Sequence, residues 1–161
     1  MLRRTKIIAT LGPATDDKSA IEGLIRAGSD LVRINFKRVD EAISMSAMYA
    51  ANHLNIKAIV ALTESGSTPL WMSRIRTAIP IFGLSRHPSS LGKMTLYRNV
   101  YPLFFDVTRY QRDEIKREAI TVLERRGLLN TGDMAFITKG DQDGVYGVTN
   151  AMKIVEVGQV V

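Results

Sequence analysis

A short loop rich in hydroxyl groups has the clearest chemistry in this sequence. It follows an apolar stretch at residues 57–62 and consists of Thr63, Glu64, Ser65, Gly66, Ser67 and Thr68. Backbone N–H groups at the start of a helix, together with neighbouring hydroxyls, bind phosphate oxygens well. The loop therefore predicts an anion site. Plain capping of the following helix by Ser67 or Thr68 explains the same spacing equally well.

A second candidate is the loop over residues 139–147, which carries three glycines. Lys139 supplies a positive charge, and Gly140 and Gly144 allow the backbone to bend over a ligand held by the hydroxyl loop. An ordinary loop between two strands of a hairpin explains the same glycines. The sequence leaves both interpretations open.

Several other chemistries find no support in the composition. The chain of 161 residues has no cysteine, which excludes disulfides, thiolate metal sites and cysteine nucleophiles. His53 and His87 have no partner at metal-ligand spacing, so we expect them at the surface or at helix caps. We expect Arg74, Arg86 and Arg98 to form structural ion pairs.

The charge and hydropathy patterns narrow the class of partner. The net charge is +6, but the basic residues are spread along the chain without interleaved aromatic residues. This spread argues against nucleic acid and favours small phosphorylated ligands. No apolar run approaches the roughly 18 residues of a membrane-spanning helix, and the stretch at residues 7–11 is too short for a signal peptide. We expect a soluble, cytoplasmic protein.

Strand and helix patterns alternate along the chain. Apolar or alternating segments predict strands at residues 5–11, 31–36, 57–62, 81–85, 100–105, 134–138 and 151–157. Amphipathic or capped segments predict helices at residues 18–27, 40–54, 89–97 and 110–126, and a further helix that has Pro69 at its first position. This order indicates an α/β fold with a mostly parallel sheet covered by helices, in which the last two strands form a hairpin at one edge.

Residues 1–36 do not fit a complete domain. They hold one strand–helix–strand unit, for which Asp16 or Asp17 is the expected helix cap and Gly28 the expected stop. Two parallel strands cannot bury both of their faces, so this unit is interpreted as the start of a larger barrel or sheet. The three residues between Phe36 and Asp40 include no Gly, Pro or Ser and are not typical of a linker.

Long motifs in this sequence resemble those of pyruvate kinases. Residues 4–15 resemble the first barrel strand of that family, residues 27–36 the second, and residues 40–51 the opening of the C-terminal domain. The similarity continues at residues 63–66, 73–74, 85–86, 96–98 and 149–150. The resemblance implies that residues 1–37 are the incomplete start of a (β/α)8 TIM barrel. It implies that residues 38–161 are a C-terminal α/β domain of regulatory type.

The resemblance also implies an activity. Pyruvate kinases transfer a phosphoryl group from phosphoenolpyruvate to ADP in glycolysis, giving pyruvate and ATP, with Mg²⁺ and K⁺, as cytoplasmic tetramers under allosteric control. The family's divalent-metal ligands and catalytic lysine have no counterpart in this sequence, so we expect the 161-residue chain alone to be inactive. The alternative is a stand-alone module that binds a phosphorylated effector, such as a sugar monophosphate or AMP, without catalysis.

Two residues of the expected second strand match the family's active site. Arg33 matches an arginine that pairs with phosphate through forked hydrogen bonds, and Asn35 matches an asparagine whose carbonyl oxygen ligates K⁺. The family continues with a serine and a histidine, where this chain has Lys37 and Arg38, so the K⁺ site is incomplete. Simple exposure of both side chains on an isolated strand explains the pattern equally well.

The family's effector-phosphate loop falls on residues 63–68, and a second effector loop falls on residues 139–147. Some members carry a lysine where this chain has Glu64. A carboxylate repels a second phosphate group. We therefore expect a monophosphate effector in preference to fructose bisphosphate.

Overall fold

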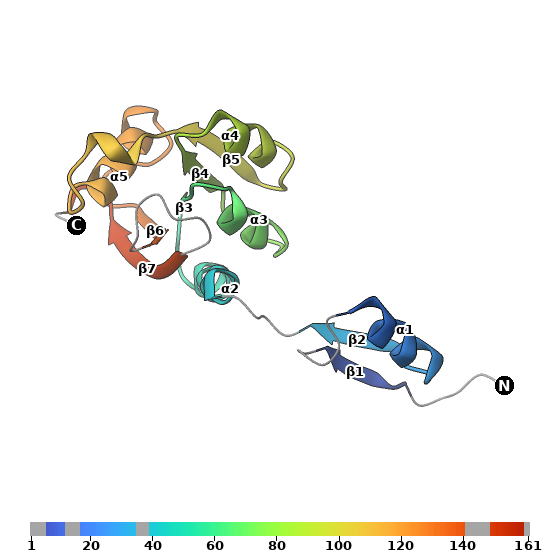
Figure 1. The fold of residues 1–161 in the computed structure, drawn as a ribbon. Coiled ribbons are helices and arrows are strands. Elements are labelled where there is room, and N and C mark those ends of the chain that lie inside the picture. The colour runs from blue at the N-terminus through green and yellow to red at the C-terminus, as the bar shows by residue number, and fades with distance from the viewer. Residues whose placement is uncertain (1–5, 12–16, 35–38, 141–148, 160–161) are drawn as a thin grey trace. The chain divides into compact units, whose positions relative to one another are not determined.

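The alternating strand and helix patterns fold into two separate units (Figure 1). The computed structural model describes residues 6–11, 17–34, 39–140 and 149–159. The first unit is Met1–Lys37 and the second is Arg38–Val161. None of the helices in these described ranges is long and apolar enough to cross a membrane.

The first unit is a single βαβ element. Strand β1 (Ile8–Leu11) and strand β2 (Leu31–Ile34) pair in parallel, with Ile8 opposite Leu31, and helix α1 (Lys18–Arg26) connects them. Of the residues in this unit whose exposure is described, none is buried. A two-stranded sheet with one helix has too little apolar contact to form a core of its own.

The limits of α1 follow from its flanking residues. The Asp17 carboxylate accepts a hydrogen bond from the N–H of Ala20 at 2.9 Å, which confirms Asp17 as the cap. Hydrogen bonds from the Ser19 hydroxyl and the Ala20 N–H hold the pKa of Asp17 below its ordinary value. Gly28 adopts φ 91° just after the helix, as the predicted stop requires.

The second unit is built on a five-stranded sheet. Its strands are β3 (Ala58–Leu62), β4 (Ile81–Ser85), β5 (Val100–Phe104), β6 (Met134–Gly140) and β7 (Thr149–Glu156). Their spatial order is β5-β4-β3-β6-β7, with β7 antiparallel to β6 and every other neighbouring pair parallel. The prediction of a mostly parallel sheet closed by an edge hairpin is confirmed.

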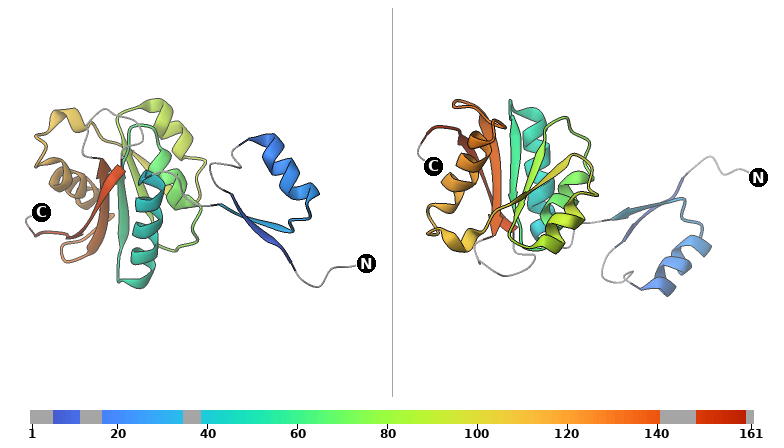
Figure 2. Two further views of the ribbon diagram at one scale, coloured as in Figure 1. Left: turned by 60° about the horizontal axis from the view of Figure 1, so that its bottom comes forward. Right: turned by 90° about the horizontal axis from the view of Figure 1, so that it is seen from above.

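Helices cover both faces of this sheet (Figure 2). Helices α2 (Val39–His53), α3 (Ser67–Ser73) and α4 (Pro88–Met94) lie on one face, where Met48, Met72 and Met94 pack against Phe136 and its neighbours. Helix α5 (Ile115–Arg125) lies on the other, where Leu123 packs against Ile137. Because both faces are covered, the parallel strands consist of continuous apolar runs.

Gly83 allows helix α4 to approach the sheet closely. It lies in β4, and a Cβ added there would stand 2.4 Å from the sulfur of Met94. The thioether occupies the space that a side chain would otherwise take. A residue without a side chain in the middle of a buried strand is therefore explained by packing.

Three predicted helix starts are wrong in detail. Helix α3 begins at Ser67 with Gly66 as its N-cap, so Pro69 is its third residue, where a missing N–H still costs little. Helix α4 begins at Pro88 rather than Ser89, since proline suits the first position. Of the predicted helix over 110–126, only residues 115–125 form a helix, α5, and a 3₁₀ turn, η2 (Val107–Arg109), precedes residue 110. Ile115, the first residue of α5, is also the first buried residue of that segment.

Candidate functional site

The hydroxyl loop, residues 63–68, lies at the carboxyl edge of the parallel strands. It follows β3, the central strand. From β3 the chain builds β4 and β5 on one side and then crosses to β6 on the other. The loops after β3 and β6 therefore leave the sheet in opposite directions. In open α/β sheets, this reversal is the point where ligands commonly bind.

The loop is closed by its own hydroxyl groups. The Thr63 hydroxyl accepts a hydrogen bond from the N–H of Gly66 at 3.0 Å, and the Ser65 hydroxyl accepts one from the N–H of Ser67 at 3.3 Å. Gly66 adopts φ 81°, a left-handed conformation that favours glycine. A phosphate bound here would therefore take over N–H donors that the loop now satisfies internally.

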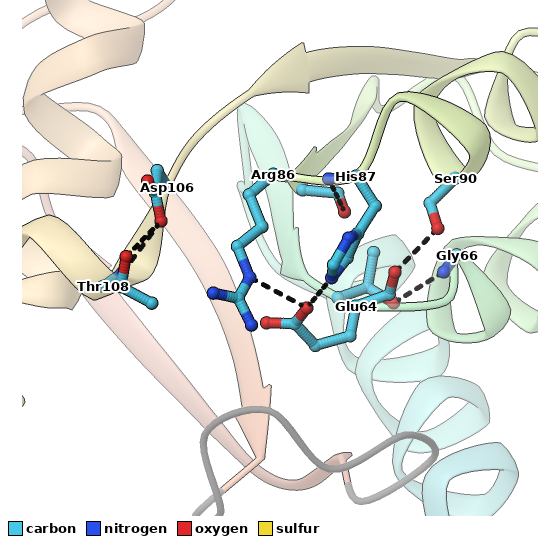
Figure 3. Close-up of polar contacts among 9 residues, drawn as sticks. Glu64, Gly66, Arg86, His87, Ser90, Asp106 and Thr108 are labelled. Carbon is cyan, nitrogen blue, oxygen red and sulfur yellow. Dashed lines mark hydrogen bonds and ion pairs between the residues drawn. The ribbon is translucent and has the colours of Figure 1, made fainter.

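Glu64 holds this loop against the end of β4 and the start of α4 (Figure 3). Its Oε2 atom receives Arg86 Nε at 3.3 Å, and Nε2 of His87 contacts the same oxygen. The Ser90 hydroxyl donates to the Glu64 carbonyl oxygen at 2.7 Å. The Glu64 side chain is only 15% exposed, and Arg86 offsets its charge. Glu64 therefore positions the loop, and its charge is partly neutralised before any ligand arrives.

Asp106 follows β5 and forms a separate set of hydrogen bonds near this network (Figure 3). Its carboxylate accepts hydrogen bonds from the hydroxyl of Thr108 at 2.7 Å and from the N–H of Thr108 at 3.1 Å. The Thr108 hydroxyl, with the N–H and the nearby charges of Arg109 and Arg86, lowers the pKa of Asp106. Arg86 thus lies within electrostatic reach of two carboxylates, Glu64 and Asp106 (Figure 3).

Thr68 has a structural role. Its hydroxyl and that of Thr149 share a hydrogen bond of 2.7 Å, and both residues are buried. This contact joins the start of α3 to the start of β7. The buried hydroxyl of Thr138 has no hydrogen-bond partner in the described part of the chain.

The sequence of this second unit matches a known family over most of its length. Residues 41–155 match the family model described as "Pyruvate kinase, alpha/beta domain". The chain belongs to the pyruvate kinase family. Residues 2–67 match a second model, "Pyruvate kinase, barrel domain". The two matches overlap at residues 41–67, which the structure places in the second unit.

Curated relatives agree with this assignment. The pyruvate kinase of Buchnera aphidicola subsp. Baizongia pistaciae is 43% identical over 134 residues, which cover 83% of this chain and 28% of the relative. Pyruvate kinase II of Salmonella typhimurium is 44% identical over 125 residues, covering 77% and 26%. The pyruvate kinase of Staphylococcus aureus is 32% identical over 130 residues, covering 81% and 22%. The chain thus spans about a quarter of the length of these relatives.

The active-site residues that the pyruvate kinase resemblance implies lie in or beside β2. Arg33 is in β2, with its backbone opposite Thr10, while Asn35 lies outside the described residues. Within the described ranges, no three His, Asp or Glu side chains gather as a metal site. The use of Mg²⁺ and the K⁺ ligand at Asn35 therefore stay predictions.

The structure does not bring the two effector loops of the resemblance together in one described pocket. Lys139 and Gly140 end β6, and Gly144 lies outside the described residues. Lys139 lines a pocket whose described lining includes no residue of the hydroxyl loop. The side chains that do meet the loop are Arg86, His87 and Ser90, none of which the sequence pattern predicted there. For Arg86 and His87, the position directly after β4 was the available signal.

The remaining cations have structural contacts. Arg86 forms the expected ion pair, but Arg74 stacks over the Trp71 ring at 4.1 Å and Arg98 donates to the Ser73 carbonyl at 2.9 Å. The backbone of His87 caps α4, as expected for a capping histidine. His53 is exposed at the end of α2, and its Nδ1 lies 2.7 Å from the Tyr49 carbonyl oxygen.

Proposed function

We propose that the second unit binds a phosphorylated effector at the hydroxyl loop and that the 161-residue chain alone does not turn over substrate. The observation that carries this proposal is the position of the loop. It lies at the carboxyl end of β3, where the order of strands along the sheet reverses. The sheet itself is covered by helices on both faces. The serine hydroxyls of the loop are half-buried. They lie beside the N–H groups of Gly66 and Ser67, which would donate to a bound phosphate in place of the loop hydroxyls.

We propose that the whole protein to which this chain corresponds catalyses the reaction of its family. This reaction is phosphoryl transfer from phosphoenolpyruvate to ADP, in a cytoplasmic homotetramer that uses Mg²⁺ and K⁺. Family membership supports the proposal. Arg33 would hold phosphate, and Asn35 would ligate K⁺. Phosphoryl transfer depends on several positioned cations around the moving group, and this chain matches only these two residues of that apparatus.

A sugar monophosphate is the proposed effector. Glu64 brings a carboxylate to the loop, and its Oε2 atom pairs with Arg86 Nε at 3.3 Å. Because Arg86 already pairs with Glu64, it is not available to neutralise a second phosphate group. One phosphate at the loop is compatible with this arrangement, whereas two phosphates require further cations.

The effector proposal is tested by calorimetry on the full chain with glucose 6-phosphate and fructose 1,6-bisphosphate. We expect the monophosphate to bind more tightly. We expect Ser65→Ala combined with Ser67→Ala to weaken it at least about tenfold, since each lost hydrogen bond to a charged group costs about 1.5–3 kcal/mol. Ser89→Ala is the matched control, because Ser89 is an exposed serine of α4. Absence of binding, or an unchanged affinity in the double variant, contradicts the proposal.

The catalytic proposal is tested by a coupled assay for pyruvate on the purified chain, with its intact mass verified. We expect no turnover above the background without protein, in the presence of phosphoenolpyruvate, ADP, Mg²⁺ and K⁺. The control is a full-length pyruvate kinase in the same buffer. Sustained turnover by a chain of 17.9 kDa would refute this part of the proposal.

A further inference from the structure

His87 lies directly against the hydroxyl loop. It is the N-cap of α4, and its Nε2 atom contacts the carboxylate of Glu64 in that loop (Figure 3). The backbone of the loop meets the same end of α4. The Ser90 hydroxyl donates to the Glu64 carbonyl oxygen, and a Cβ added at Gly66 would lie 3.7 Å from the Ser90 carbonyl oxygen. The His87 side chain is 34% exposed, so solvent protons reach it.

The fixed charges around His87 form two ion pairs. Arg86, which follows β4, pairs with Glu64 at 3.3 Å, and Arg109, which follows β5, pairs with Asp106 at 3.4 Å. The first turn of α4 carries no acid. Its N–H groups carry partial positive charge and oppose a proton on the imidazole, whereas the Glu64 carboxylate favours one. Each of these two carboxylates is thus balanced by one guanidinium group.

Histidine is the side chain that changes its charge near neutral pH. A free imidazole gains its proton between pH 5 and 8, whereas guanidinium groups stay charged. The Thr108 hydroxyl holds the pKa of Asp106 below its ordinary value, so Asp106 keeps its negative charge across that range. Lys93, the charged residue of α4, lies in the last turn, at the opposite end of the helix. The two ion pairs therefore leave no net charge, and a proton on His87 makes this group of described residues positive.

We propose that His87 is a positioning residue whose protonation strengthens anion binding at the hydroxyl loop. This inference rests on the proposed function of the loop and adds its regulation by pH. As the pH falls, the imidazole takes up a proton, and Glu64 then faces two cations, Arg86 and His87. The surplus positive charge attracts the phosphate group. Because linkage between two binding sites is reciprocal, the bound phosphate in turn favours the protonated imidazole.

The test is calorimetry on the full chain with glucose 6-phosphate, at about pH 5.5 and about pH 7.5, on either side of the ordinary histidine value. The unchanged chain is compared with His87→Gln, in which the amide still donates to Glu64 but takes up no proton. The titration of the ligand is common to both proteins and cancels in the ratio of their affinities. We expect the ratio of unchanged to variant affinity to be at least about fivefold higher at the lower pH, which is the lower end of typical couplings between sites.

His53→Gln is the matched control, because the chain has two histidines. His53 ends α2 and precedes β3, so it lies at the amino end of that strand, whereas the hydroxyl loop follows the carboxyl end. A strand of five residues separates the two by roughly 16 Å. Exposed charges are largely screened beyond about 10 Å at 0.1 M salt. His53→Gln should therefore keep the pH dependence of the unchanged chain. Thermal melting of both variants verifies that they fold.

NMR of the imidazole protons gives the location of the effect. Glucose 6-phosphate should move the midpoint of the His87 titration to higher pH and leave that of His53 unchanged. An affinity ratio that does not change with pH, an equal loss of pH dependence in His53→Gln, or an unmoved His87 midpoint overturns this inference while the proposed function stands. Absence of glucose 6-phosphate binding at both pH values overturns the proposed function and this inference together.

Discussion

Replacing Phe136 with alanine is expected to lower the free energy of unfolding of the second unit by about 3–5 kcal/mol. Phe136 is 1% exposed and lies in β6, inside the sheet. Its ring packs into the core formed with α2, α3 and α4. The loss combines the transfer free energy of the ring with the cavity that remains. It is a large part of the roughly 5–15 kcal/mol that stabilises an ordinary domain.

Urea denaturation followed by circular dichroism measures this effect, with Phe104→Ala as the matched control. Phe104 is 52% exposed and lies in β5, at the edge of the sheet. The same truncation there should cost less than about 1 kcal/mol, because most of the ring already contacts water. If the two variants lose equal stability, the core does not lie between β6 and the three helices.

The second large effect concerns whether the second unit folds without the first. Deleting residues 1–37 should leave the second unit folded, with its unfolding free energy changed by less than about 0.5 kcal/mol. A peptide of residues 1–37 should show no cooperative unfolding. The reason is that β1, α1 and β2 have no buried residue among those whose exposure is described, whereas the second unit has two apolar cores.

Thermal melting of the full chain, of residues 38–161 and of the peptide decides this prediction. The full chain is the control and should share its melting transition with residues 38–161. A fall in the melting temperature of more than about 5 °C on deletion would show that the first unit stabilises the second. A cooperative transition of the isolated peptide would show that the βαβ element is a domain in its own right.

The regular elements of the second unit could be predicted because local patterns determine them. The apolar run at 81–85 became β4 with those bounds, and the run at 57–62 became β3 with one residue fewer. Helix starts were less predictable. Ser67 and Thr68 are good capping residues, but the hydroxyls of Thr63 and Ser65 close the loop one position earlier, and Gly66 takes the cap.

The candidate site was predictable only in part. The hydroxyl loop is contiguous in sequence, so its residue types revealed it. Arg86 and His87 lie 22 and 23 positions from Glu64, and they meet it only because β3 and β4 are parallel neighbours whose carboxyl ends share one edge. Lys139 was grouped with the loop through its glycine-rich segment and through a resemblance, whereas strand alternation places it on the face toward α5. Such contacts depend on register, which residue composition does not encode.

Oxidation of the buried methionines reports how often the second unit opens. Met48, Met72 and Met94 are fully buried in the core beneath α2, α3 and α4. The buried members described for the core beneath α5 include no methionine. Peroxide oxidises a thioether only when it reaches the sulfur, and the chain has no thiol to compete for the oxidant. The rate of sulfoxide formation at these three residues therefore reports how often one side of the sheet loses its helical cover, whatever happens on the other.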